Sequence, residues 1–353
     1  MDDHAHSGGP HLTWFEDLTR DDLAEVGGKN ASLGEMVARL GSQGIRVPPG
    51  FATTAGAYRS YIAANGLEVV LAAALGQLAD GRLTLPEAGH RIRAAVAAGT
   101  WPPDIEQAIR AAYRTLAERA GMPEPAVAVR SSATAEDLPD ASFAGQQETF
   151  LNIRGEAALL SACRRCYASL FTDRAITYRQ IKGFDHLAVA LSIGVQLMVR
   201  SDEGGSGVMF SLDTESGFDK LVLINAAWGL GETVVQGAVS PDEYQVYKPF
   251  LDDESRVPIL HKALGAKEIK MIYGAGPETP TRTVPTSRAE RESFVLSEAE
   301  ILELSRMAVR IERHYGQPMD MEWARDGQGG PLYIVQALCV VDSNLFTKLA
   351  IFL

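Results

Sequence analysis

The sequence changes character near Ala126, and this change limits the folds open to the chain. Residues from about 55 to 120 are rich in Ala and Leu, and their apolar spacing predicts mostly helix. From Val127 onward, short β-rich runs are separated by Gly, Asp and Ser, a pattern typical of strands joined by turns. A chain of 353 residues can build two domains or one two-lobed domain with an ample core. We therefore expect an α+β protein with a mixed first lobe, a strand-rich second lobe and a cleft between them.

Individual elements can be predicted on both sides of this change. A long polar loop should run from Ser131 to Gln147, one helix should cover 156–181, and 250–296 should form a peripheral hairpin or loop region. Ser297 and Glu300 form a capping box that should open another helix. We expect strands at 127–130, 149–153, 189–199, 207–211, 221–225, 244–247, 319–324 and 332–336.

Composition excludes several classes of partner. The formal net charge of −12 argues against non-specific binding to nucleic acid or to anionic lipid. No apolar run reaches the roughly 20 residues that span a bilayer, and residues 1–10 lack the apolar core of a signal peptide.

The odd count of three cysteines fits a reducing compartment. Cys163 and Cys166 have redox-motif spacing but lie in a helical apolar pattern, so a structural role is favoured. The chain is expected to be cytoplasmic.

Gly27-Gly28-Lys29 is the first candidate for chemistry. Two glycines before a helix can expose backbone N–H groups, and the positive end of the helix suits an anion such as phosphate. Lys29 would add a mobile positive charge. The simpler interpretation is a Gly-Gly turn followed by a solvated lysine.

Arg130 closes the predicted strand at 127–130, and its planar guanidinium matches phosphate oxygens in a bidentate geometry. The loop that follows is rich in small residues and could fold over a polyphosphate. Gly145 would allow close backbone approach there, and Thr149 would donate a hydroxyl. A structural salt bridge at Arg130 and an ordinary surface loop are the alternatives.

Glu322 and Gln336 lie on two predicted strands joined by a tight Gly-rich connection. If that connection is centred near residue 329, the two residues sit nearly opposite one another, with Cβ atoms about 4.5–5.5 Å apart. A carboxylate and an amide oxygen are hard ligands suited to Mg²⁺. The alternative is a buried hydrogen bond between the two side chains.

The order and wording of the motifs are more specific than any one of them. Over roughly residues 14 to 337 the chain resembles the N-terminal nucleotide-binding domain of the phosphoenolpyruvate synthase (pyruvate, water dikinase) family. The motifs that carry this resemblance are Val26-Gly-Gly-Lys-Asn-Ala-Ser-Leu-Gly-Glu-Met36, Val47-Pro-Pro-Gly-Phe-Ala-Thr-Thr54, Ala128-Val-Arg-Ser-Ser-Ala-Thr-Ala-Glu-Asp-Leu-Pro-Asp-Ala-Ser-Phe-Ala-Gly-Gln-Gln-Glu-Thr-Phe150, Trp228-Gly-Leu-Gly-Glu232, Pro241-Asp-Glu-Tyr244 and Met319-Asp-Met-Glu-Trp-Ala324.

The resemblance implies an ATP-grasp fold, with ATP between two α+β lobes, and a two-step reaction. ATP would first phosphorylate a histidine on a separate swivelling domain, giving AMP and phosphate, and the phosphohistidine would then phosphorylate pyruvate in a C-terminal barrel. Lys29 and Arg130 would clamp phosphates, Gly145 and Thr149 would lie on the phosphate lid, and Gln196 would sit at the adenine side.

By the same resemblance, Glu322 and Gln336 would hold Mg²⁺ and the triphosphate. The family sequence has an arginine two residues after this glutamine, whereas this chain has Leu338. The histidine domain and the barrel are partners missing from this sequence, so we expect a truncated chain whose complete activity is doubtful. Related alternatives are the same domain of a rifamycin phosphotransferase or of a pyruvate, phosphate dikinase, and an alternative of another kind is an inactive ATP-binding remnant.

These expectations divide the chain into four parts. A flexible leader covers 1–13, the first lobe 14–185, the second lobe 186–337, and an aberrant apolar tail 338–353.

Overall fold

The computed structural model describes residues 10–134, 137–138, 141–142, 148–276 and 278–340. The chain forms two compact units. Unit 1 comprises Met1–Ala38 and Pro49–Met198, and unit 2 comprises Arg39–Pro48 and Val199–Leu353. Both units combine helices with an antiparallel sheet, so the expected α+β class is confirmed.

Unit 1 is built on a five-stranded sheet whose order is β1-β2-β7-β3-β6. Every neighbouring pair in this sheet is antiparallel. The described strands of this unit are β1 (Leu12–Trp14), β2 (Gly50–Thr53), β3 (Val127–Ala133), β6 (Thr149–Ile153) and β7 (Leu191–Leu197), with the short pair β4 (Asp137–Leu138) and β5 (Ala141–Ser142) outside the main sheet.

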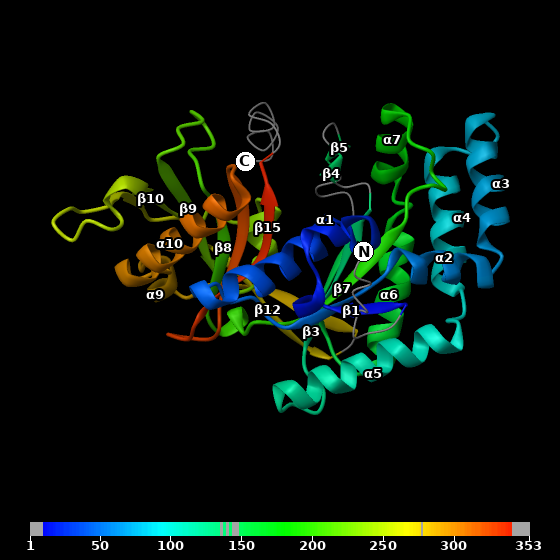
Figure 1. Cartoon of the computed structure of the whole chain (residues 1–353), viewed down its shortest axis with the longest axis horizontal. Coiled ribbons are helices and arrows are strands. Elements are labelled where there is room, and N and C mark those ends of the chain that lie inside the picture. The colour runs from blue at the N-terminus through cyan, green and yellow to red at the C-terminus, as the bar shows by residue number, and fades with distance from the viewer. Residues whose placement is uncertain (1–9, 135–136, 139–140, 143–147, 277, 341–353) are drawn as a thin grey trace. The chain divides into compact units, whose positions relative to one another are not determined.

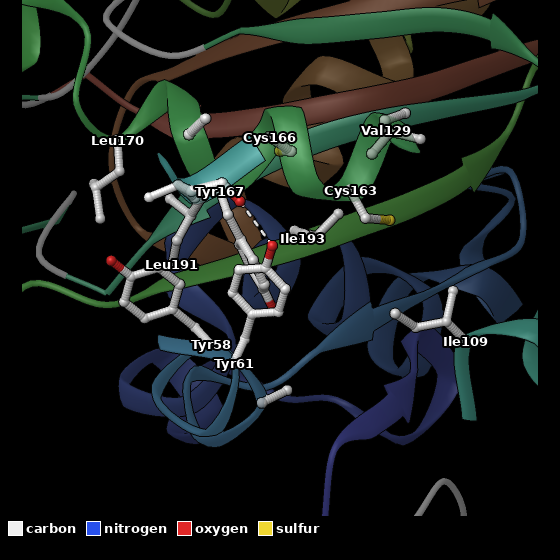
Figure 2. Close-up of a cluster of buried hydrophobic side chains, with 14 of the residues drawn as sticks. Tyr58, Tyr61, Ile109, Val129, Cys163, Cys166, Tyr167, Leu170, Leu191 and Ile193 are labelled. Atoms are coloured by element: carbon white, nitrogen blue, oxygen red, sulfur yellow. Dashed lines mark hydrogen bonds between the residues drawn. The ribbon is translucent and has the colours of Figure 1, made fainter. Parts of the chain in front are cut away.

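The helices of unit 1, apart from the first, form a large apolar core against one face of this sheet. Cys163, Cys166 and Tyr167 pack in that core with Val129 of β3 and Ile193 of β7 (Figure 2). The helices are α1 (Leu23–Glu35), α2 (Ala55–Ala64), α3 (Leu67–Ala79), α4 (Leu85–Ala98), α5 (Pro103–Ala120), α6 (Glu156–Ser169) and α7 (Asp173–Lys182).

The two α6 cysteines are free thiols inside this core. Burial raises the pKa of Cys163 to about 12, and burial likewise raises the pKa of Cys166. Neither thiol is positioned to act as a thiolate nucleophile or metal ligand at neutral pH, since both roles require the deprotonated form. The structural role expected from the sequence is confirmed.

Unit 2 is built on a six-stranded antiparallel sheet whose order is β11-β10-β9-β8-β14-β15. Helix α10 (Glu298–Tyr315) lies against β9, β10, β14 and β15, and its buried residues include Ile301, Leu304 and Ile311 (Figure 1). The strands are β8 (Gly205–Phe210), β9 (Leu221–Trp228), β10 (Asp242–Tyr247), β11 (Ile259–Ala263), β14 (Met319–Arg325) and β15 (Leu332–Cys339). Unit 2 also contains α8 (Glu232–Val235), the hairpin β12 (Ile269–Gly276) and β13 (Thr279–Pro285), α9 (Arg288–Arg291) and short 3-10 helices.

A fully buried ion pair ties the start of β10 to the segment before the β12–β13 hairpin. Asp242, from the Pro241-Asp-Glu-Tyr motif, pairs with Lys267. Its carboxylate also accepts hydrogen bonds from the backbone N–H groups of Gly265 (2.9 Å) and Val295 (2.8 Å). Buried charges persist where partners satisfy them in this way. This part of the family motif therefore has a structural role.

Three sequence-based boundaries need correction. The single helix expected over 156–181 is broken into α6 and α7, because the Thr172 side chain caps the backbone N–H of Ala175 and starts a new helix. The expected leader ended at residue 13, but Leu12–Trp14 pair with β2 and are buried. β3 continues through Ala133, so the loop begins later than Ser131.

The division between units also differs from the expected one at 185/186. β7 occupies the middle of the first sheet, between β2 and β3, so the first unit extends to Met198. At the other end, Leu338 and Cys339 belong to β15 rather than to a separate tail, while residues 341–353 lie outside the described part of the chain.

The capping box was predicted correctly. The Ser297 hydroxyl accepts the backbone N–H of Glu300 at 3.3 Å, the Glu300 carboxylate accepts the N–H of Ser297 at 2.8 Å, and α10 follows. The β12–β13 hairpin lies within 250–296, where a peripheral hairpin or loop region was expected, but β11 of the same range joins the main sheet of unit 2.

Within the described residues, no single helix is both long and apolar enough to cross a bilayer. Helices α2 and α3, bent by 87° where they meet, reach the required length and apolar character only when they are taken as a pair.

Candidate functional site

Arg130 lies on β3, between strands β6 and β7 of the unit 1 sheet. On β3 it is directly opposite Thr149 of β6 and Gly194 of β7. Residues directly opposite in an antiparallel ladder project from the same face of the sheet. Arg130, Thr149 and Gly194 therefore share one face, and the Asn30 side chain lies over Gly194 on that face. The core residue Val129 projects from the opposite face, toward α6.

Gln196 lies two residues along β7 from Gly194 and so belongs to the same face. It is directly opposite Gly50 of β2 and Ala128 of β3, and it is buried. Gly145, also a sequence-predicted residue of this region, lies outside the described residues.

The Gly-Gly-Lys segment lies against the face that carries Arg130. A kink at Gly27 (φ 70°, ψ 165°) divides α1, so a new helical segment begins at Gly28 and Lys29. A Cβ at Gly27 would come within 2.4 Å of Ser132 Oγ, and Ser132 shares its face with Arg130. Only glycine accommodates both this backbone conformation and this close approach. The helix start that the sequence predicts after the glycines is present.

Unit 2 brings Glu322 and Gln336 together as predicted. The two residues are directly opposite on β14 and β15, which confirms the predicted register. Gln336 Nε2 donates to Glu322 Oε1 at 3.2 Å. The hydrogen bond offered as the alternative interpretation is therefore present, and it fixes the orientation of both side chains on one face of the sheet.

Asp320 is a candidate site residue that the sequence analysis missed. It lies two residues before Glu322, so it projects from the same face of β14. Its partners across the ladder are Phe210 on β8 and Leu338 on β15. Burial between such neighbours, together with the Glu322 charge, raises the pKa of Asp320 to about 7. The Asp-x-Glu spacing within a predicted strand was the signal that could have found it.

The donor set on this face fits a hard divalent cation. Asp320 and Glu322 offer two carboxylates and Gln336 an amide oxygen, and Mg²⁺ is typically held by one or two carboxylates together with substrate phosphates. No cluster of three or more His, Cys, Asp or Glu side chains with metal-binding geometry occurs among the described residues. This set therefore suits a cation whose other ligands come from a bound molecule.

Leu338 occupies the same face, directly opposite Asp320. The position at which the resemblance implies an arginine is thus opposite Asp320, which shares its face of β14 with Glu322. With Leu338 there, an apolar side chain stands where a guanidinium would compensate their charge.

Comparison with known proteins identifies the kind of domain. Residues 23–340 match the family model of the pyruvate phosphate dikinase AMP/ATP-binding domain. The chain is 56% identical over 330 residues to a phosphoenolpyruvate synthase of Pseudomonas aeruginosa, covering 93% of this chain and 41% of that protein. It is 52% identical over 344 residues to the one of Synechocystis sp., with 94% and 42% covered, and 50% identical over 337 residues to that of Escherichia coli, with 94% and 42% covered. The chain thus spans about two fifths of the length of these curated relatives. It belongs to the family of pyruvate phosphate dikinase AMP/ATP-binding domains.

Proposed function

We propose that the chain binds Mg·ATP and serves as the nucleotide-binding part of a phosphoenolpyruvate synthase. The observation that carries this proposal is an identity of about 50% or more to phosphoenolpyruvate synthases over more than nine tenths of the chain. We further propose that the two units are the lobes of an ATP-grasp fold and that both contribute residues to one nucleotide site.

In this proposal the residues of unit 1 bind the phosphates and the base. Lys29 and Arg130 neutralise and orient phosphate oxygens, and the N–H groups at the start of the helix after Gly27 point to the same anion. Thr149 donates its hydroxyl, and Gln196 lies at the adenine side. Arg130, Thr149 and Gln196 share one face of the sheet, and the Gly27-Gly28-Lys29 segment lies against that face, which supports this assignment.

The residues of unit 2 would hold the cation. Asp320, Glu322 and Gln336 supply oxygen ligands for Mg²⁺, which when bound neutralises charge on the transferring phosphoryl group. Phosphoryl transfer needs positioning and charge neutralisation more than covalent help from the protein. The acceptor histidine, pyruvate and water of the whole reaction would involve parts of the protein beyond the matched two fifths.

A complementation assay tests this function. A full-length Pseudomonas aeruginosa phosphoenolpyruvate synthase, with the residue that aligns with Arg130 replaced by Met, would keep every other part but lose the proposed phosphate contact at that position. We expect that adding this chain restores AMP formation from ATP and pyruvate, and that the chain carrying Arg130→Met does not. Equal AMP formation with and without the chain would contradict the proposal.

The second candidate, an ATP-binding domain without transfer activity, is favoured by Leu338. Replacing Leu338 by Arg should tighten Mg·ATP binding about tenfold, because a guanidinium beside Asp320 would reach phosphate oxygens in a bidentate geometry. Leu338→Lys should recover less, since an ammonium lacks the planar fork.

Isothermal titration of the two variants against Mg·ATP measures the difference. An unchanged affinity in Leu338→Arg would show that residue 338 does not adjoin the phosphates.

A further inference from the structure

Asn30 is a buried polar residue that follows Lys29 directly and is only 2% exposed. Its backbone N–H donates to Ser132 Oγ of β3 at 3.4 Å. Its side-chain Nδ2 donates to Ser192 Oγ of β7 at 2.9 Å and to the carbonyl oxygen of Val26 at 3.2 Å. The Asn30 side chain and backbone therefore connect the helical segment after the kink to strands β3 and β7 and to Val26, the residue before the kink.

These bonds continue into the sheet. The Ser192 hydroxyl donates to the carbonyl oxygen of Thr53 at 2.6 Å, and Thr53 Oγ1 accepts the backbone N–H of Ile193 at 3.0 Å. Ser132, Ser192 and Thr53 are all buried. Apolar side chains could fill this space without requiring partners, whereas each of these polar groups is stable only if its hydrogen bonds are made. The network therefore specifies one position of α1 on the sheet.

The hydrogen-bond network holds α1 on the sheet next to Arg130. A Cβ at Gly194 would lie 2.3 Å from Asn30 Oδ1, so the asparagine stands directly over Gly194. Gly194 is in turn the residue opposite Arg130 across the β3–β7 ladder. Asn30 thus follows Lys29 in the chain. In space, its side chain lies over Gly194, which is directly opposite Arg130 in the β3–β7 ladder.

We propose that Asn30 is a positioning residue for polyphosphate binding. By fixing α1 to Ser132 and Ser192, it holds Lys29 and the N–H groups after Gly27 at one distance from Arg130, so that both cations meet a single triphosphate. This inference rests on the proposed function, but it adds a residue that would contact neither the nucleotide nor the metal. A misplacement of about 1 Å in such a support can cost about 100-fold in function.

A merely structural asparagine would behave differently. Asn65 is a matched control in the same unit: its Nδ2 donates to the carbonyl oxygens of Tyr61 (2.8 Å) and Thr100 (2.9 Å), and its Oδ1 accepts the N–H of Thr100 (2.8 Å). It thus makes a comparable set of side-chain bonds at the junction of α2 and the segment before α5. It lies outside the network that joins α1 to β3 and β7.

The test uses the full chain with Asn30→Ala, Ser192→Ala and Asn65→Ala. Dissociation constants for Mg·ATP and for adenosine are measured by competition against a fluorescent nucleotide, and thermal unfolding is followed in parallel. We expect Asn30→Ala to weaken Mg·ATP by about tenfold or more while adenosine binding changes less than about twofold, since adenosine has no phosphate to misplace. Ser192→Ala should show the same selective loss, and Asn65→Ala should lower thermal stability without changing the ratio of the two affinities.

The double variant Asn30→Ala/Ser192→Ala should lose little more affinity for Mg·ATP than either single variant, because both remove the same link. Equal weakening of ATP and adenosine, or a loss of thermal stability alone, would overturn the positioning role. If Asn30→Ala does not fold, Ser192→Ala decides by the same criterion. Failure of the unaltered chain to bind Mg·ATP would instead refute the proposed function, and this inference with it.

Discussion

Replacing Asp320 by Asn should stabilise the protein at pH 8 by about 2–4 kcal/mol, an unusual direction for a substitution at a proposed ligand site. Asp320 lies between Phe210 and Leu338 and next to Glu322, and burial with that neighbouring charge raises its pKa from 3.8 to about 7. An acid whose folded pKa is raised binds its proton more tightly in the folded state. The free energy of unfolding is therefore lower at pH values where the carboxylate is ionised in the unfolded state.

The pH window follows from these two pKa values. Below the unfolded pKa both states are protonated and the penalty vanishes; it grows as pH rises and is complete above about pH 7. The stabilisation by Asp320→Asn should thus fall to about 1 kcal/mol or less at pH 4.5. Urea unfolding at the two pH values measures the difference, with Asp252→Asn, an exposed aspartate, as the control. An equal effect at both pH values, or destabilisation at pH 8, would show that Asp320 is not held in this environment.

This penalty has a functional interpretation. A divalent cation beside Asp320, or an arginine at position 338, would stabilise the ionised carboxylate and offset the cost. Sites that bind charged ligands are often destabilising in their absence, because they are arranged for the ligand rather than for the fold. Asp320, whose pKa is raised by burial and by the Glu322 charge, has this character.

Replacing Arg130 by Met should weaken Mg·ATP binding by about 30- to 100-fold, corresponding to about 2–3 kcal/mol. The guanidinium would contribute charge-assisted bonds to phosphate oxygens that methionine cannot make, while methionine keeps much of the apolar stem. Arg130 lies on the face opposite the core, so the fold should be little affected. Isothermal titration with Mg·ATP measures the loss.

Arg110→Met is the matched control for this experiment. Arg110 also belongs to unit 1, but it pairs with Glu106 at 2.7 Å and Glu156 at 2.8 Å, so it has a structural role on the surface of α5. We expect this variant to bind Mg·ATP like the unaltered chain. If Arg110→Met and Arg130→Met lose the same affinity, the loss reflects the stability of unit 1 and not a phosphate contact.

Local rules predicted the elements whose signals are short in range. The capping box at Ser297 set the start of α10. The Gly-rich turn brought β14 and β15 together, and a β-bulge between Glu322 and Trp323 completed the register that places Glu322 opposite Gln336. Both depend on residues within about fifteen positions of one another, where turn chemistry and strand periodicity decide the outcome.

The features that were missed depend on tertiary structure. β7 joins the first sheet by pairing with β2 and β3, which are distant in sequence, so periodicity alone placed it in the wrong unit. The burial that raises the pKa of Asp320 depends on pairing with β8, where its partner Phe210 lies more than a hundred residues earlier in the chain. Such environments exist only after strands that are remote in sequence have paired.

The number of nucleotides bound per chain, measured with two variants, tests the central claim most directly. Isothermal titration of the full chain with Mg·ATP should give one site per chain, and both Arg130→Met of unit 1 and Glu322→Gln of unit 2 should weaken that site by about tenfold or more. Such a result would mean that both units serve one nucleotide. No binding at millimolar Mg·ATP, two independent sites, or an affinity that only one of the two variants changes would contradict the account.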